Sequence, residues 1–184
     1  MMNQQTHIKE LVRSILAKNP IYLDTETTGT GKKDEIISIG IVDTDGTVLL
    51  DTLVKPTIPI SPSSTCIHGI TDADVANAPT FAEVTPTLRA TVKKRDVVIY
   101  NTGFDIRMLI QSARANHIRR VFIPKMHCAM KIYSKFYGEQ NHCSYHWHKL
   151  SNAALYCQIP VPDNLHDAVV DSQLTRQVFN YMAK

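Results

Sequence analysis

The sequence has few of the features that mark secreted or membrane-bound proteins. Its four cysteines include no CxxC pair, and a domain of this length does not need disulfide bonds to be stable. The apolar runs are only a few residues long, which is too short for a membrane span. The first 20 residues lack the apolar core and cleavage site of a secretory signal. We therefore expect a soluble, cytoplasmic protein with reduced thiols.

Internal repeats, low-complexity tracts and linkers are also absent from the sequence. Its 184 residues, 43% of them hydrophobic, are enough to form one buried core, so we expect a single domain spanning residues 1–184. The net charge of +3 permits a polyanionic partner but does not require one. Charge and composition therefore leave the function open.

The first part of the chain predicts one helix followed by an antiparallel meander. We expect a helix within residues 1–19 that packs on the domain and ends at Pro20. Its apolar stripe consists of Ile8, Leu11, Val12, Ile15 and Leu16. Three β-rich runs follow at 21–26, 35–42 and 47–54, and the turns between them contain glycine and aspartate.

The rest of the chain predicts strands that alternate with helices. Thr71 and Thr80 have the residue type and position of helix N-caps. The expected elements are an extended segment (55–65), a helix (81–92), a buried strand (97–101), a helix (104–118), a strand (121–125) and a C-terminal helix of about twenty residues. This pattern after a meander indicates an α/β domain with a mixed sheet.

Two carboxylates, Asp24 and Glu26, stand two residues apart at the end of the first expected strand. Side chains at this spacing point to the same face, where two carboxylates repel each other unless a cation lies between them. Asp105 follows a later strand, and Asp167 and Asp171 lie one turn apart on the last helix. Clustered carboxylates favour Mg²⁺ or Mn²⁺, and metal pairs held in this way are typical of phosphodiester chemistry.

Two stretches of the sequence partly resemble other site types. The stretch TTGTGKK lacks the glycine and the Ser or Thr that a Walker A phosphate loop requires, and it does not match a dinucleotide loop. The stretch NHCSYHWHK contains four zinc-type ligands, His142, Cys143, His146 and His148. Their spacing fits no regular zinc motif. Tyr145, Trp147 and His148 better suit stacking on bases and contacts to phosphates, although an aromatic loop without a ligand stays possible.

Three motifs in this order resemble those of the DnaQ-like, DEDDh-type 3′-5′ exonucleases. They are DTETTG at 24–29, NTGFD at 101–105 and HDAVVD at 166–171. The segment IHGITDADVANAPTF at 67–81 is similar to the one that this family carries between its first two motifs. The resemblance implies an RNase H-like fold, in which helices flank a mixed five-stranded β-sheet.

The resemblance also implies residue roles. Two divalent cations, Mg²⁺ or Mn²⁺, would be held by four acids: Asp24, Glu26, Asp105 and Asp171. His166 would be the general base. Asp167 then becomes a charge at the helix start rather than a ligand. The terminal nucleotide would be held by Thr27, Thr28, Ile67, His68, Asn101 and Phe104. Phe104 could equally belong to the core, and His68 could cap the turn at Gly69.

The implied function is a metal-dependent 3′-5′ exonuclease that releases nucleoside 5′-monophosphates from DNA. An exoribonuclease of the same family is the nearest competing hypothesis, because a contact to the 2′-hydroxyl cannot be recognised in one sequence. Two competing hypotheses come from different classes: a non-catalytic nucleic-acid-binding or polymerase-associated module, and an RNase H-like endonuclease. The sequence identifies no protein partner.

Overall fold

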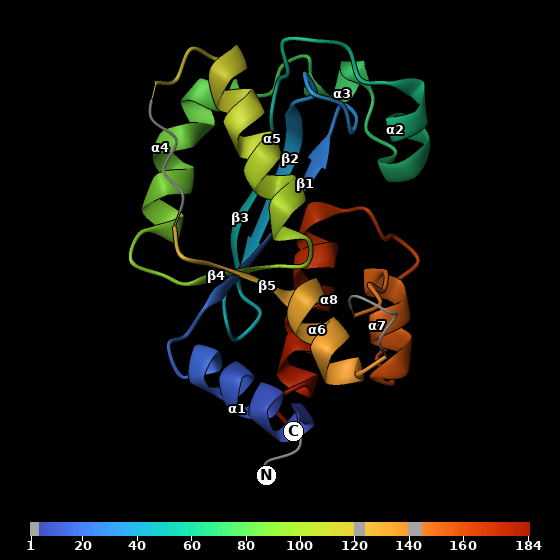
Figure 1. Cartoon of the computed structure of the whole chain (residues 1–184). Coiled ribbons are helices and arrows are strands. Elements are labelled where there is room, and N and C mark those ends of the chain that lie inside the picture. The colour runs from blue at the N-terminus through green and yellow to red at the C-terminus, as the bar shows by residue number, and fades with distance from the viewer. Residues whose placement is uncertain (1–3, 120–123, 140–144) are drawn as a thin grey trace.

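The computed structural model describes residues 4–119, 124–139 and 145–184. A five-stranded sheet in the order β3-β2-β1-β4-β5 forms its centre (Figure 1). Its strands are β1 (Ile21–Thr27), β2 (Ile36–Val42), β3 (Val48–Leu53), β4 (Val97–Ile99) and β5 (Met126–Cys128). The first three pair antiparallel, whereas β4 runs parallel to both β1 and β5. The predicted mixed five-stranded sheet is therefore confirmed.

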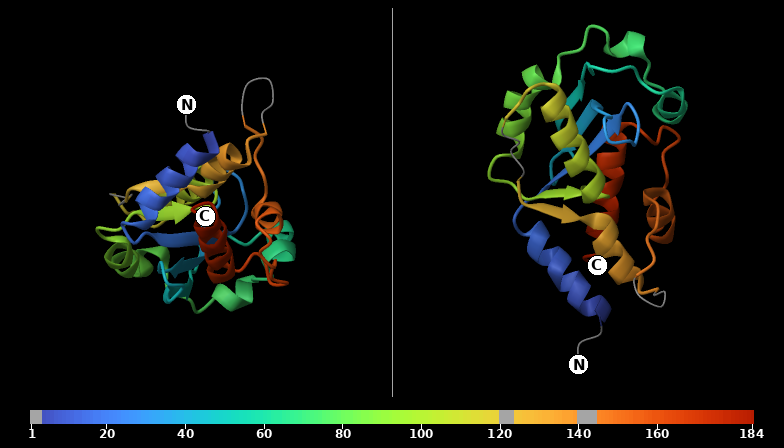
Figure 2. Two further views of the ribbon diagram at one scale, coloured as in Figure 1. Left: turned by 90° about the horizontal axis from the view of Figure 1, so that it is seen from below. Right: turned by 45° about the horizontal axis from the view of Figure 1, so that its top comes forward.

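Helices cover both faces of the sheet (Figures 1 and 2). Tyr22 of β1 belongs to a hydrophobic core with α8 (Ala168–Tyr181), α6 (Ala129–Tyr137), α7 (Leu150–Tyr156) and α1 (Gln4–Leu16). Ile21 and Leu23, which point to the opposite face, belong to a core with α4 (Phe81–Val92) and α5 (Thr102–Ala115). Two short helices, α2 (Pro62–His68) and α3 (Asp72–Val75), follow the meander. None of the described helices is long and apolar enough to cross a membrane.

Most of the predicted elements are present. The N-terminal helix packs Ile8, Val12 and Ile15 into the core and ends before Pro20. Thr80 caps α4, because its side chain accepts from the Glu83 N–H while the Glu83 carboxylate accepts from the Thr80 N–H. These elements have the hydrophobic spacing and caps that make them recognisable in a sequence.

Two predicted elements differ from the structure. The strand beside β4 is Met126–Cys128, and Pro124 and Lys125 of the predicted strand precede it. The rest of that prediction, residues 121–123, lies outside the described residues. The extended segment expected at 55–65 ends earlier, because α2 begins at Pro62. Ser61 caps this helix by accepting from the Ser64 N–H, and proline is favourable in the first turn of a helix. Helices α6 and α7 were not predicted.

Gly40 allows α8 to begin directly on β2. A Cβ atom at this position would lie 2.3 Å from the backbone carbon of Ala168 and 2.4 Å from the Val169 nitrogen. The Gly40 carbonyl also accepts a hydrogen bond from the Ser172 hydroxyl at 3.0 Å. Because Gly40 is the pairing partner of Asp24, this contact fixes the start of α8 beside Asp24.

We predict that Gly40→Ala destabilises the protein by about 1–3 kcal/mol, since the added methyl group overlaps backbone atoms that cannot move separately. The melting temperature should fall by about 2–4 °C per kcal/mol, measured by differential scanning calorimetry. Gly103→Ala is the control, because a Cβ there has no heavy atom of the described chain within 4 Å. Equal melting temperatures for the two variants would contradict this explanation.

Candidate active site

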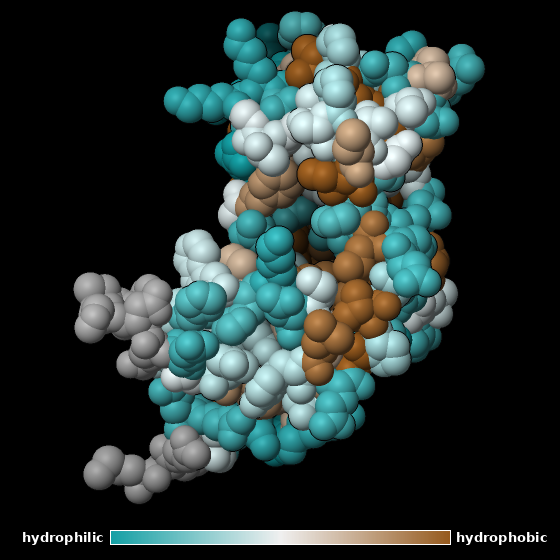
Figure 3. All heavy atoms as spheres, turned by 90° about the vertical axis from the view of Figure 1, so that its right-hand side faces the viewer, coloured by the Kyte–Doolittle hydropathy of each residue, from teal (hydrophilic) through white to brown (hydrophobic). Residues whose placement is uncertain are grey.

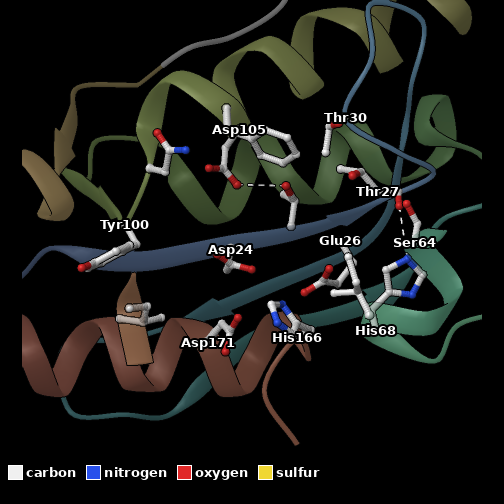
Figure 4. Close-up of a pocket in the computed structure, with 15 residues that line it drawn as sticks. Asp24, Glu26, Thr27, Thr30, Ser64, His68, Tyr100, Asp105, His166 and Asp171 are labelled. Carbon is white, nitrogen blue, oxygen red and sulfur yellow. Dashed lines mark hydrogen bonds between the residues drawn. The ribbon is translucent and has the colours of Figure 1, made fainter. Parts of the chain in front are cut away.

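A cavity of about 310 Å³ lies at the end of β1 and contains all five predicted catalytic residues. Figure 3 shows the face that carries α2 and α7, where the surface is hollowed and apolar residues gather beside the hollow. Figure 4 shows the acidic side chains of β1 between α5 and α8. The predicted catalytic residues in its lining are Asp24, Glu26, Asp105, His166 and Asp171.

The position of each carboxylate follows from its element. Asp24 and Glu26 continue the face of β1 that Tyr22 buries against α8, because side chains alternate along a strand. Asp171 lies in the first turn of α8, and Asp105 lies in the first turn of α5 on the opposite side of the strand (Figure 4). Within the described residues, β1 pairs with β4 only at Ile21 and Tyr22. Beyond Tyr22 this edge of β1 is not covered by β4, so carboxylates from the two faces of the sheet can approach one another there.

Thr25 holds Asp105 in place from β1. Its hydroxyl donates to the Asp105 carboxylate at 2.9 Å (Figure 4). Asp105 is only 3% exposed, so this hydrogen bond compensates part of the cost of burying its charge. The alternating β1 residues therefore have two roles: two acids face α8, and the threonine between them positions the acid of α5.

Burial and mutual repulsion raise the pKa values of these carboxyl groups. The pKa of Asp24 lies well above its usual range because of its burial and then the charges of Asp105, Asp171 and Glu26. Burial and the charges of Asp171 and Asp105 raise the pKa of Glu26 to about 8. Burial alone raises the pKa of Asp105 to about 7, and burial also raises that of Asp171, where His166 opposes the shift. The site therefore disfavours four negative charges without a compensating cation.

His166 lies directly before α8 and is exposed. Its backbone φ of +68° is in the left-handed region, which histidine adopts more readily than most residues other than glycine. One ligand-type atom each from His166, Glu26 and Asp171 lies within 4.8 Å of the others. Asp167 instead caps α8, because its carboxylate accepts from the backbone N–H groups of Val169 and Val170 at 3.0 and 3.1 Å.

The side chains in the cavity fit a divalent cation. Oδ1 of Asp171 is buried and has no hydrogen-bond partner among the described residues, so a cation would satisfy it. The surrounding donors are carboxylate oxygens, the ligand type that Mg²⁺ and Mn²⁺ prefer. The same carboxylates repel one another, and a cation between them would remove that penalty.

Five of the six residues expected to hold a terminal nucleotide line the cavity: Thr27, Ile67, His68, Asn101 and Phe104. Thr28 is fully buried, and its hydroxyl donates to the Asp34 carboxylate at 2.7 Å while accepting from the Glu35 N–H. Thr28 thus supports the loop behind the cavity rather than its surface.

His68 and Phe104 combine both of the roles considered for them. Nδ1 of His68 accepts from the Ile70 N–H at 3.0 Å, so Nε2 carries the proton and donates to the Thr27 carbonyl at 3.2 Å (Figure 4). His68 therefore caps the turn and ties α2 to the end of β1 while its ring lines the cavity. Phe104 packs partly against the core, with the Arg107 guanidinium 5.3 Å from its ring centre.

The aromatic segment lies beside the first cavity rather than in it. Trp147 and His148 line a neighbouring cavity of about 540 Å³, whose lining also includes His166 and Asp171. The Tyr145 hydroxyl instead bonds to Gln4 of α1. His142 and Cys143 lie outside the described residues. Sequence reasoning missed five lining residues: Thr25, Thr30, Ser64, Tyr100 and Leu150. Only Thr25, between the two acids of β1, and Tyr100, at a strand end, had a signal in their position.

We predict that Glu26→Gln stabilises the metal-free protein at pH 8. Folding raises the pKa of Glu26 from 4.5 to about 8, so the folded state binds more protons than the unfolded state between these values. The free energy of unfolding therefore falls as the pH rises through this window, and the variant avoids this loss. In EDTA at pH 8 its melting temperature should be a few degrees above wild type, and the difference should shrink toward pH 5.

Glu10→Gln is the matched control for this measurement, because Glu10 is exposed on α1. Its melting temperature should equal that of wild type at both pH values. A Glu26→Gln variant that is less stable than wild type at pH 8 would show that its carboxylate does not oppose folding.

Comparisons with known proteins agree with this geometry. The exonuclease family model RNase_T matches residues 21–179. The uncharacterised exonuclease CP81 of Escherichia phage 186 is 35% identical over 183 residues, covering 96% of this chain and 94% of the relative. DNA polymerase III subunit epsilon of Escherichia coli K12 is 28% identical over 179 residues, covering 86% of this chain and 69% of the relative. The structure of Exonuclease X in complex with 5′ overhanging duplex DNA superposes with a TM-score of 0.64 at 26% identity, covering 88% of this chain and 90% of that one. The chain therefore belongs to the DnaQ-like, DEDDh-type exonuclease family and is a nuclease with an RNase H-like fold.

Proposed function

We propose that this protein is a metal-dependent 3′-5′ exonuclease that acts on DNA as a single domain and releases nucleoside 5′-monophosphates. The observation that carries the proposal is the meeting of four carboxylates and one imidazole in one cavity. They come from β1, α5 and the start of α8, which are far apart in the sequence. This donor set has the composition that phosphodiester hydrolysis with divalent cations requires.

The four acids would hold two Mg²⁺ or Mn²⁺ ions: Asp24, Glu26, Asp105 and Asp171. When bound, such ions supply a polarised attacking water and neutralise the charge that develops on the leaving 3′-oxygen. Asp24 would be the central ligand of this set, because it interacts electrostatically with all three other carboxylates. Thr25 keeps Asp105 oriented by its hydrogen bond throughout.

His166 is proposed to take the proton from the attacking water. Its imidazole is exposed at the cavity that holds the acids, and its ring lies near the Glu26 and Asp171 carboxylates. An imidazole can accept a proton at neutral pH, where an ordinary carboxylate is a weaker base. The left-handed backbone at His166 lies directly before Asp167, the N-cap residue of α8.

The shape of the cavity favours a chain end as substrate. Ile67 and His68 of α2 and Phe104 of α5 line the same cavity as the acids. A volume of about 310 Å³ is at the lower end of small-ligand sites, which suits one terminal nucleotide better than a continuous strand. Ile67, which is 58% exposed, and Phe104 would contact its sugar and base.

DNA is proposed as the substrate on the strength of the relatives. Exonuclease X was solved in complex with duplex DNA, and the epsilon relative is a DNA polymerase subunit. An exoribonuclease would differ only in a contact to the 2′-hydroxyl, so a direct comparison of the two polymers decides between them.

The test uses 5′-labelled single-stranded DNA, duplex DNA and RNA of one sequence, with Mg²⁺ or Mn²⁺. We expect ladders that shorten from the 3′ end, with DNA cut faster than RNA and closed circular DNA left intact. Asp24→Asn and His166→Asn should each lower the rate by at least about 100-fold. Asparagine is chosen at position 166 because it tolerates the left-handed backbone.

Asp167→Asn is the matched control, because asparagine caps a helix as well as aspartate does. This variant should keep its activity within a few-fold of wild type. Faster cleavage of RNA than of DNA would show that the protein is an exoribonuclease. Cleavage of the closed circular DNA would show that it is an endonuclease. Full activity of the His166→Asn variant would contradict the proposal that His166 is the general base.

A further inference from the structure

A second group of metal-ligand side chains belongs to the part of the chain between the end of α6 and the start of α7, two helices labelled in Figure 1. None of these residues lines the acidic cavity. Glu139, His146 and His148 each offer one ligand atom, and the three atoms lie within 4.8 Å of one another. Glu139 lies outside the histidine-rich stretch NHCSYHWHK, so the sequence spacing alone did not associate it with the two histidines.

Local structure brings these three residues together. Gly138 ends α6 in the left-handed conformation, with φ +86°. The Glu139 carbonyl then accepts from the His146 N–H at 3.0 Å, which brings these two residues together. The His148 ring packs against Tyr137, with ring centres 4.4 Å apart. The cluster is therefore held by backbone and aromatic contacts that do not involve a ligand.

One polar atom of this cluster requires a partner. Nε2 of His148 is buried and has no hydrogen-bond partner among the described residues. A buried ring nitrogen in this state is destabilising unless a donor, a water or a metal ion satisfies it. Glu139 and His146 are exposed and can turn toward an ion without losing core contacts.

The donor set of two imidazoles and one carboxylate is typical of Zn²⁺ with an open fourth position. Two ligand atoms at tetrahedral positions on zinc are about 3.4 Å apart. The three ligand atoms lie within 4.8 Å of one another, so rotation of the two exposed side chains can bring them to this separation. Imidazole also separates this site chemically from the acidic cavity, whose carboxylate oxygens favour harder ions.

We propose that Glu139, His146 and His148 form a Zn²⁺ site that fixes the rim of the nuclease cavity. The Tyr100 hydroxyl donates to the His148 carbonyl at 2.9 Å, and Tyr100 lines both cavities. Trp147, 61% exposed, lies between the two histidine ligands and lines the neighbouring cavity. A bound ion would thus restrain the segment that carries Trp147 beside the acids. His142 and Cys143 are not part of the proposed site.

The test exploits Trp147, which is the single tryptophan of the sequence. The full chain without a histidine tag is titrated with Zn²⁺ in excess Mg²⁺, and tryptophan emission and bound zinc are measured, the latter by equilibrium dialysis. We expect one Zn²⁺ per chain and a saturable change in emission. His146→Ala and Glu139→Ala should each weaken binding at least tenfold. Both residues are exposed, so the two variants should fold.

Two controls separate this site from others. His7→Ala removes an exposed histidine of α1, and Asp24→Asn alters the acidic cavity. Both should bind Zn²⁺ as wild type does. The proposal is overturned if one equivalent of Zn²⁺ leaves the emission unchanged or if His146→Ala and Glu139→Ala bind as wild type does. Loss of the response in Asp24→Asn would likewise overturn it, because the ion would then lie among the acids.

Discussion

Four carboxylates share one small cavity at the end of β1, and their mutual repulsion is the constraint around which this site is organised. Asp24 interacts with all three of the others, burial with the charges of Asp171 and Asp105 raises the pKa of Glu26 to about 8, and burial raises that of Asp105 to about 7. Such a cluster is costly without a cation, because burial and like charges both favour the protonated forms. The fold nevertheless buries these carboxylates together, and cation binding in the cavity is therefore strongly favoured.

Three features of the fold keep the acids together despite that repulsion. Gly40 lets α8 begin against β2, which places Asp171 beside the strand that carries Asp24 and Glu26. Thr25 binds Asp105 from the other face of β1. His68 connects α2 to the last residue of β1, which fixes one wall of the cavity. Each feature uses backbone contacts or short neutral side chains, so the acids remain available for ligands.

Much of this arrangement could be predicted from the sequence, because the elements that carry the acids have strong patterns. Strands β1 to β3 and helices α5 and α8 show clear hydrophobic patterns, and the acids lie near the end of β1 and in the first turns of α5 and α8. The pairing of Thr25 with Asp105 could not be predicted, since the two residues are 80 positions apart. Strand β5 has three residues, too few for a period, and its neighbours in space decide its place. Thr28 and Tyr145 have suitable chemistry for ligand contacts, but tertiary packing directs them to Asp34 and Gln4.

Proton release on metal binding tests the combined effect of burial and repulsion on the acids. Mn²⁺ binding to the full chain is measured by titration calorimetry at pH 7 in buffers of different ionisation enthalpy, which gives the number of protons released per ion. Because the pKa values of Glu26 and Asp105 are about 8 and 7, binding should release about one proton or more from these groups. Glu26→Gln should release fewer. Binding without proton release, or with equal release in the variant, would contradict the account of a repulsive carboxylate cluster that a cation stabilises.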